Sequence, residues 1–271
     1  MKLTARRTLL TGAGSGIGRA LALELADRGG RLVLVGRRNG PLEETAALVA
    51  ERGGRAHVVA SDLRADGEPD RVVAAAAEAL GGLDLLVNNA GNVRAGRLED
   101  APAEDLLAML ELNLVVPVLL TRAALPHLKQ AAAHGDTGIL GVASGIALVA
   151  LPFYATYAAT KGGLARFDEA LRRELGPDGI HVATAYPGAT DTEMMSSSDA
   201  GDDLGFGRRP VLDVAADIIA GLEAGDHDIN TALPERRTLQ ELNAADPLAV
   251  DRALAPRLAA LEEATRSHRS I

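Results

Sequence analysis

Short apolar runs alternate with longer stretches of helical period over the first two-thirds of the chain, and this alternation limits the possible folds most. Two of the runs, Leu32-Val33-Leu34-Val35 and Leu85-Leu86-Val87, are continuous and apolar, which is typical of parallel strands buried on both faces. Strands that alternate with helices predict βαβ units. We therefore predict an α/β fold with a single doubly wound parallel sheet and helices on both faces.

The expected strands are short, apolar and rich in β-branched residues, and they cover residues 8–10, 31–35, 56–60, 83–87, 138–142 and 181–185. The expected helices carry apolar residues at spacings of three and four, and they cover residues 17–27, 42–52, 69–80, 103–128 and 153–175. A further helix is expected over 211–225.

We expect one domain over residues 1–271, because α/β folds reach about 250 residues as single domains. Residues 6–188 form its predicted nucleotide-binding and catalytic core. Residues 189–210 are rich in Ser, Asp and Gly, so we expect a mobile lid over the substrate. Residues 211–271 form a predicted helical extension. Its last part places four leucines on one expected helical face, interrupted by Pro256: Leu248, Leu254, Leu258 and Leu261.

Composition excludes several kinds of function. The chain has no cysteine, which rules out disulfides, thiolate nucleophiles and cysteine-ligated metals. A net charge of −9 and an aromatic content of 2% argue against nucleic-acid binding. The longest apolar run, 114–120, is far shorter than the roughly 20 residues of a membrane span. We therefore expect a cytoplasmic protein that binds neither nucleic acid nor membrane.

A glycine-rich turn directly follows the first expected strand and reads Thr11-Gly12-Ala13-Gly14-Ser15-Gly16-Ile17-Gly18. Glycines in this context let the backbone turn tightly, approach a pyrophosphate and direct the N–H groups of the next helix toward it. The spacing is G-x-x-x-G-x-G rather than the common G-x-G-x-x-G. A plain strand-to-helix turn is the alternative interpretation.

The second expected strand ends without the acidic residue that binds the ribose 2′-hydroxyl in NAD sites. Counting 20 residues on from Gly16 reaches Gly36, and Arg37 and Arg38 follow. Two cations without a carboxylate favour the 2′-phosphate of NADP over NAD, although they could also be solvated surface arginines. Asp62, just after the third strand, is expected to hold the adenine amino group or to cap the following turn.

Tyr157 and Lys161 lie four residues apart in a predicted helix, so their side chains share one face. A neighbouring ammonium favours the phenolate and lowers the pKa of a tyrosine, which makes Tyr157 a candidate general acid/base. Ser144 lies thirteen residues upstream of Tyr157. It follows a buried-looking strand, at the edge where doubly wound sheets bind ligands.

Together these motifs resemble the short-chain dehydrogenase/reductase family, which has a Rossmann fold. The resemblance covers about residues 6–192. It is carried by residues 11–18, Asn88-Asn89-Ala90-Gly91, Asn113, Ser144, Tyr157-x-x-x-Lys161 and Pro187-Gly188, in the family's order and at similar spacing.

The resemblance implies a ketone–alcohol interconversion by hydride transfer with a nicotinamide cofactor. It implies that Tyr157 exchanges a proton with the substrate oxygen, that Lys161 holds the nicotinamide ribose, and that Ser144 hydrogen-bonds the substrate oxygen. Asn113 would anchor a water in the proton relay. No metal is expected. The expected cofactor-binding residues are Gly12, Gly14, Ser15, Gly16, Ile17, Gly18, Arg37, Arg38, Asp62, Leu63, Asn89, Ala90, Gly91, Tyr157, Lys161, Pro187, Gly188 and Thr192.

One alternative concerns Tyr154, which precedes Tyr157 by three residues and lies near the same helical face. Its spacing to Ser144 and Lys161 is wrong for the family pattern, so Tyr157 is the predicted acid/base. The six histidines form no metal-binding spacing, and all are expected to be ordinary surface or core residues.

The substrate is expected to be a medium-sized, uncharged, largely apolar ketone or secondary alcohol. The expected lining residues are apolar or amphipathic: Ile146, Leu148, Phe153, Tyr154, Met194, Met195 and Phe206. Anions would be discouraged by the acidic residues of the lid, Asp199, Asp202 and Asp203, unless Arg94 and Arg97 face the pocket.

The resemblance also implies a homodimer or homotetramer assembled through the helices of residues 103–128 and 153–175. Two alternative functions stay open at this point. One is a nucleotide-binding redox sensor that acts through a partner protein without catalysis. The other is an epimerase or dehydratase with tightly bound NAD, which normally has a larger substrate domain after residue 189.

Overall fold

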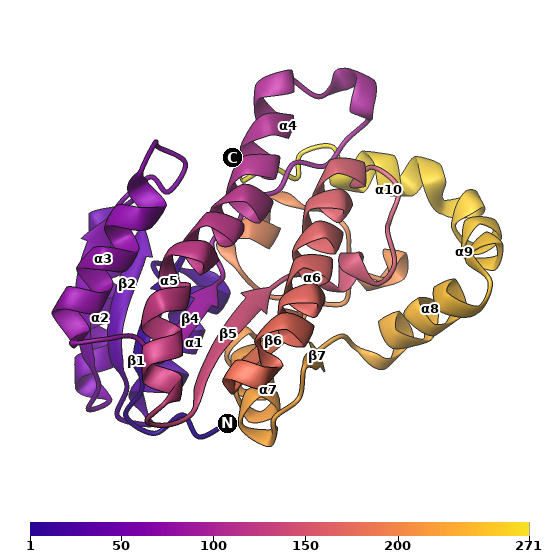
Figure 1. The fold of residues 1–271 in the computed structure, drawn as a ribbon. Coiled ribbons are helices and arrows are strands. Elements are labelled where there is room, and N and C mark those ends of the chain that lie inside the picture. The colour runs from indigo at the N-terminus through magenta and orange to yellow at the C-terminus, as the bar shows by residue number, and fades with distance from the viewer. Residues whose placement is uncertain (271) are drawn as a thin grey trace.

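Seven parallel strands form one sheet with the order β3-β2-β1-β4-β5-β6-β7 in a computed structural model that describes residues 1–270, apart from the side chain of Asp203 (Figure 1). The strands are β1 (Arg7–Thr11), β2 (Arg31–Gly36), β3 (Arg55–Ala60), β4 (Leu85–Asn88), β5 (Thr137–Val142), β6 (Ile180–Tyr186) and β7 (Asp228–Asn230). Every neighbouring pair is parallel. The predicted doubly wound sheet is confirmed.

The α-helices lie in two layers on the sheet and in a C-terminal arc (Figure 1). They are α1 (Gly16–Ala26), α2 (Asn39–Glu51), α3 (Glu68–Leu80), α4 (Ala103–Leu110), α5 (Val116–Ala132), α6 (Ala155–Leu175), α7 (Val211–Ala224), α8 (Pro234–Ala245), α9 (Pro247–Leu254) and α10 (Leu258–Thr265). Buried residues of α1, α2 and α7 pack on one face of the sheet, and those of α3, α5 and α6 pack on the other.

Alternate residues of each central strand enter these two cores. Leu9 and Val33, which pair in register, face the α3–α5–α6 layer, whereas Leu10 and Leu34 face the α1–α2–α7 layer. All four are fully buried, and burial of a leucine or valine side chain contributes about 1.5–3 kcal/mol each. Because both faces are covered, the strands are continuously apolar.

The helix predicted over residues 103–128 is interrupted in the structure. A π-helical turn, Glu111–Val115, separates α4 from α5. The fully buried side chain of Asn113 lies in this turn and hydrogen-bonds the backbone of Asn92. A single wide turn keeps apolar residues at spacings of three and four, so the sequence pattern did not reveal it. Such turns occur frequently at functional sites.

The segment Ala103–Ala132 has the length and hydropathy of a membrane span. Core helices of many proteins have the same properties, and here Val116, Leu120, Ala124 and Leu128 belong to the core between α5 and the sheet.

The C-terminal leucines do not share one helical face, so that expectation was wrong. A 3-10 turn, Ala255–Arg257, which contains Pro256, separates α9 from α10. Leu248 and Leu258 are 63% and 42% exposed, while Leu261 is buried. After α10 the chain returns to the loop that follows β4, where the Ala95 N–H donates to the His268 carbonyl at 3.0 Å. The end of the chain therefore lies beside the carboxyl end of β4, where the Asn88–Gly91 motif is found.

Candidate active site

The carboxyl ends of β1, β4, β5 and β6 meet at one edge of the sheet and open into two adjoining cavities. Every predicted cofactor-binding residue lines one or both of them. The first cavity runs from the glycine-rich turn past Ser144 and Tyr157 to the C-terminal segment. The second lies over the end of β2 and contains Arg37, Arg38 and Asp62. What these residues bind is not shown by their position and stays a prediction.

The glycine-rich turn has a geometry that only glycine allows at several positions. Gly12 and Gly16 have φ angles of +66° and +51°, in the left-handed region that favours glycine. A Cβ added to Gly18 would overlap with the Gly12 carbonyl oxygen, and one added to Gly16 would lie 3.2 Å from Thr192 Cγ2. The turn is therefore an open backbone cradle at the start of α1, which fits a pyrophosphate.

The turn after β4 supports this cradle through Asn89 and Thr11. Asn89 Nδ2 donates to the Thr11 carbonyl oxygen at 2.9 Å, and the backbone N–H groups of Asn89 and Ala90 both donate to Thr11 Oγ1 at 3.0 Å. The first and fourth strand ends are thus fixed to each other directly below the cavity.

The predicted cations line the second cavity, and beside Arg38 lies an acid of the first cavity that local sequence reasoning missed. Arg38 pairs with Glu193 at 3.1 Å, and both side chains are more than 60% exposed. Glu193 follows β6, about 155 residues after Arg38 in the chain. No acid stands next to the two arginines in the sequence, but the fold brings Glu193 beside Arg38. Asp62 pairs with Arg64 at 3.2 Å, which holds the pKa of Asp62 below its usual value.

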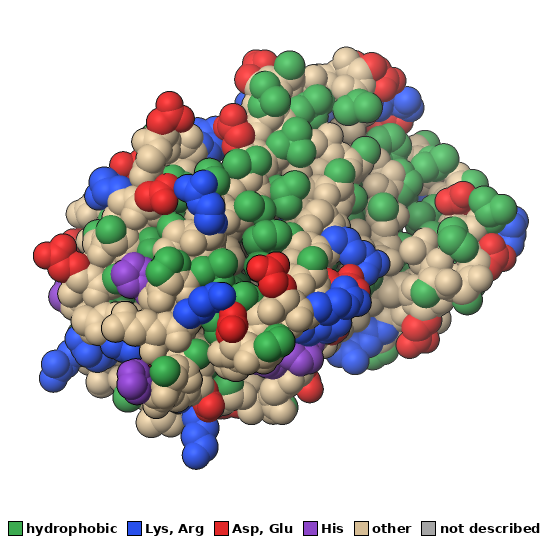
Figure 2. Space-filling model, in the orientation of Figure 1, with side chains coloured by type: hydrophobic (Ala, Val, Ile, Leu, Met, Phe, Trp, Pro, Cys, Tyr) green, Lys and Arg blue, Asp and Glu red, His purple; other side chains and the backbone are tan. Residues whose placement is uncertain are grey.

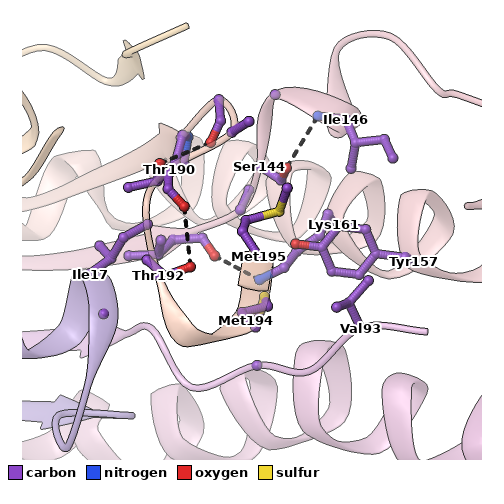
Figure 3. Close-up of a pocket in the computed structure, with 18 of the residues that line it drawn as sticks. Ile17, Val93, Ser144, Ile146, Tyr157, Lys161, Thr190, Thr192, Met194 and Met195 are labelled. Carbon is purple, nitrogen blue, oxygen red and sulfur yellow. Dashed lines mark hydrogen bonds between the residues drawn. The ribbon is translucent and has the colours of Figure 1, made fainter. Parts of the chain in front are cut away.

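Ser144, Tyr157 and Lys161 lie together in the first cavity (Figure 3). Ser144 follows β5, and its Oγ accepts a hydrogen bond from the Ile146 N–H at 3.3 Å. Tyr157 and Lys161 extend from the first two turns of α6. Lys161 Nζ donates to the Val142 carbonyl oxygen at 2.9 Å and lies 6.0 Å from the centre of the Tyr157 ring. The spacing of the three residues in the sequence thus brings three polar groups into one place.

Burial dominates the ionisation of the two titratable groups. It raises the pKa of Tyr157 to about 12, while hydrogen bonding with Ser144 acts in the opposite direction. It lowers the pKa of Lys161 to about 8, and the negative charge of Asp168 opposes this shift. Desolvation therefore sets the direction of the Tyr157 pKa shift, and the lowering expected from the ammonium is not among its causes. Tyr157 keeps its proton near neutral pH and can act as an acid.

Asp168 is a buried carboxyl group on α6 that sequence reasoning missed. Its side chain is 1% exposed, and Oδ2 accepts from Thr184 Oγ1 at 3.1 Å. Burial raises the pKa of Asp168 to about 7. A Cβ on Gly141 would overlap with this carboxyl group, so glycine is required on β5. An aspartate at a helical position normally indicates a solvated face, and nothing local distinguished this one.

Asn113 does not line either cavity. Its Oδ1 accepts from the Asn92 N–H at 2.8 Å, and its Nδ2 donates to the Asn92 carbonyl oxygen and to Thr160 Oγ1. An added Cβ on Gly91 would lie 3.0 Å from Asn113 Oδ1 and 3.3 Å from Lys161 Nζ. Asn113 therefore lies behind Gly91, close to Lys161 but away from the open space, and its role as an anchor for a water stays a prediction.

Tyr154 is also buried at this site, but His268 uses its hydroxyl group. His268 Nε2 lies 3.1 Å from the Met194 carbonyl oxygen, and His268 Nδ1 lies 2.7 Å from Tyr154 Oη. A carbonyl oxygen can only accept, so Nε2 carries the proton and Nδ1 accepts from the Tyr154 hydroxyl. Burial lowers the pKa of His268 and so favours the neutral form of its imidazole. The Tyr154 hydroxyl thus donates its hydrogen bond to His268, whereas the Tyr157 hydroxyl interacts with Ser144.

The substrate end of the cavity differs in part from the expectation. Five of the seven predicted residues line it: Ile146, Tyr154, Met194, Met195 and Phe206. Leu148 and Phe153 do not. Five further lining residues were not predicted: Val93, Val149, Leu151, Arg236 and His268. The last two, Arg236 and His268, come from the C-terminal part of the chain. Only their place in the folded chain identifies them.

The charged side chains expected to influence this end lie elsewhere. Arg94 pairs with Asp105 and Arg97 with Glu262, and neither arginine lines the cavity. Asp199 and Asp202 are exposed and outside it as well, and the side chain of Asp203 lies outside the described part of the chain. Among the described residues, no group of three His, Asp or Glu side chains is arranged to hold a metal ion.

A parallel doubly wound sheet with a glycine cradle at its first strand and a Ser–Tyr–Lys group beside it defines a nucleotide-binding type of oxidoreductase. Comparison with known sequences gives the family. The family model described as short chain dehydrogenase matches residues 6–203, and this chain belongs to the short-chain dehydrogenase/reductase family.

Individual relatives agree with this assignment. An uncharacterized oxidoreductase of Staphylococcus aureus is 30% identical over 201 residues, 74% of this chain and 84% of that protein. An uncharacterized oxidoreductase of Thermotoga maritima is 32% identical over 195 residues, 72% of this chain and 76% of the relative. A crystal structure of a short chain dehydrogenase from Burkholderia cenocepacia in complex with NADP has a TM-score of 0.74 and 30% identity, covering 85% of this chain and 96% of the other.

Proposed function

We propose that the protein is an NADP-preferring oxidoreductase that interconverts a ketone and a secondary alcohol, with Tyr157 as the general acid/base. The observation that carries the proposal is the convergence of Ser144, Tyr157 and Lys161 in the cavity that begins at the glycine-rich turn. The Burkholderia cenocepacia relative binds NADP in its crystal structure, which supports the same cofactor class here. Arg37, for which the described residues contain no ion pair, supports the preference for the 2′-phosphate.

Each residue has a distinct task in the proposed reaction. The hydroxyl groups of Ser144 and Tyr157 hydrogen-bond the substrate oxygen. In carbonyl reduction Tyr157 gives its proton to that oxygen as negative charge develops there. The ammonium group of Lys161, held by the Val142 carbonyl oxygen, stabilises the tyrosinate that remains. The bound cofactor supplies the hydride.

The wall of the cavity indicates a substrate with a largely apolar carbon skeleton. Val93, Ile146, Leu151, Met194 and Met195 line the space beside Ser144 and Tyr157 (Figure 3). Methionine side chains adapt to ligands of different shapes. The lid function of residues 189–210 stays a prediction, and the presence of Met194 and Met195 in the cavity wall supports it.

A panel of ketones and secondary alcohols tested with NADPH, NADH and their oxidised forms examines the proposal. We expect NADPH-dependent turnover, and we expect Tyr157→Phe to reduce kcat by about 10²–10⁴-fold without weakening NADPH binding. Tyr154→Phe is the matched control and should keep most of the activity. Full activity of Tyr157→Phe with loss of activity in Tyr154→Phe would reverse the assignment. NADPH binding without any turnover would favour a redox sensor, which the presence of all three polar groups does not suggest.

We also propose that the chain forms a homodimer or homotetramer through α4, α5 and α6. Apolar side chains gather over α4 and α5 on the surface seen in Figure 2, and Leu107, Leu110 and Val115 are 56%, 37% and 46% exposed. Light scattering should give a mass at least twice that of the chain. Leu107→Glu should reduce the mass toward that of the monomer, and an unchanged mass would place the interface elsewhere.

A further inference from the structure

Arg236 places a positive charge at the substrate end of the cavity. It lies in the first turn of α8 and lines the cavity together with Phe206, Tyr154 and His268. Arg236 and Lys161 are the cations among the lining residues. Lys161 belongs to the reacting centre, so Arg236 has no task in the chemistry proposed above.

The contacts of Arg236 leave most of its hydrogen-bond donors unused. Nη2 donates to the Gly205 carbonyl oxygen at 2.7 Å, and the guanidinium carbon lies 5.1 Å from the centre of the Phe206 ring. A guanidinium group has five N–H donors. Within the described part of the chain no carboxylate pairs with Arg236, whereas Arg94, Arg97 and Arg209 each have an ion pair. Burial lowers the pKa of Arg236, which is the cost of holding this charge away from water.

The other polar groups at this end are already satisfied. Tyr154 donates to His268 Nδ1, and His268 Nε2 donates to the Met194 carbonyl oxygen. Glu193, the acidic side chain among the described lining residues, pairs with Arg38 at the cofactor end. An anion at the substrate end would therefore meet a guanidinium group with free donors and no competing carboxylate among the described residues.

We propose that Arg236 binds a carboxylate on the substrate, so that the substrate is a keto acid or hydroxy acid with an apolar chain between its two functional groups. This inference rests on the proposed function, and it replaces the sequence-based expectation of an uncharged substrate. The planar guanidinium group can bind a carboxylate through two parallel hydrogen bonds. The apolar wall between Arg236 and the Ser144–Tyr157 pair would contact the carbon chain.

The test uses methyl ketones that end in a carboxylate, from levulinate upward in chain length, each compared with its methyl ester under NADPH. For the best acid we expect kcat/KM to exceed that of its ester by about 10- to 100-fold. Arg236→Gln should abolish this preference, because the kcat/KM of the acid falls toward that of its ester. Arg236→Lys, which keeps the charge, should retain part of the preference.

Arg237→Gln is the matched control on the same helix. Arg237 is bonded to the carbonyl oxygens of Asn230 and Ala232 and does not line the cavity, so this variant should keep the preference for acids. Equal turnover of acids and esters by the unmodified protein, or an acid preference that survives in Arg236→Gln, would overturn the inference.

A binding measurement separates this inference from the proposed reaction. Octanoate and octanamide are titrated into the NADP-loaded protein by calorimetry. Tighter binding of octanoate that disappears in Arg236→Gln supports the carboxylate site even when no ketone is turned over, in which case the proposed reaction fails alone. Equal binding of both compounds, or no binding of either, overturns the carboxylate site while ketone turnover still tests the reaction.

Discussion

The two ends of the site are built in different ways. The nucleotide end consists mainly of backbone, in the glycine-rich turn after β1 and the Asn89 turn after β4, and each turn is a continuous motif in the sequence. The substrate end consists of side chains from five separate segments, represented by Val93, Tyr154, Met194, Arg236 and His268. The six aromatic residues all lie between Phe153 and Phe206, so neither the glycine-rich turn nor the Asn89 turn contains one.

This difference has a physical basis. A backbone cradle binds groups common to all nucleotides, so it depends on φ angles and close approach, which glycine provides locally. Recognition of a particular substrate depends on side chains that define shape and charge. Such side chains can come from any segment that the fold brings to the cavity, including the C-terminal helices.

A substitution that disrupts the backbone cradle should cause the largest loss of stability and of NADPH affinity. Gly18→Ala adds a Cβ that overlaps with the Gly12 carbonyl oxygen and lies 2.5 Å from Asn89 Nδ2. We expect about 2–4 kcal/mol of lost stability and NADPH binding at least about tenfold weaker, as measured by chemical denaturation and fluorescence titration. Gly40→Ala in α2 is the control, because an added Cβ meets nothing within 4 Å. If Gly18→Ala kept both the stability and the NADPH affinity of the unmodified protein, the turn would have to accommodate a Cβ at this position.

Arg37→Asp tests whether a side chain also determines cofactor choice at the nucleotide end. We expect the ratio of kcat/KM for NADPH to that for NADH to fall by about 10- to 100-fold, since an attractive charge becomes a repulsive one near the 2′-phosphate. Arg38→Asp should have a smaller effect, because Arg38 is already paired with Glu193. Equal use of both cofactors by the unmodified protein would contradict the proposed preference.

The same difference explains what the sequence could predict. The prediction of a parallel sheet and of the cofactor-binding positions depends on local patterns of apolar residues and glycines. Arg236 and His268 depend on the path of the C-terminal segment, which local helical spacing does not determine. The π-helical turn at Asn113 was hidden because it preserves the apolar spacing. Asp168 was hidden because its burial depends on Gly141 of a neighbouring strand.

His268→Ala should affect the substrate end alone. Loss of the imidazole leaves the buried Tyr154 hydroxyl without its acceptor and releases the Met194 carbonyl oxygen. An unsatisfied buried hydroxyl costs about 1–3 kcal/mol, and we expect a raised KM for the ketone with unchanged NADPH affinity. His134→Ala, at an exposed position, is the control. A loss of NADPH affinity equal to the loss of substrate affinity would show that the two ends are not independent.

Two of the three tyrosines, Tyr154 and Tyr157, line the first cavity, whereas Tyr186 lies on β6 outside it. Burial raises the pKa of Tyr157 to about 12 and raises the pKa values of Tyr154 and Tyr186 further. An unfolded tyrosine titrates near pH 10, so the folded state holds these protons more tightly. The stability that they contribute is fully present below about pH 10 and is lost as pH rises through the folded-state pKa values.

Tyrosinate absorbance should therefore appear in the folded protein only above about pH 11, or together with unfolding followed by circular dichroism. A tyrosine that ionises near pH 10 or below while the protein stays folded, and whose signal disappears in Tyr157→Phe, would show that burial does not control the pKa of the acid/base residue.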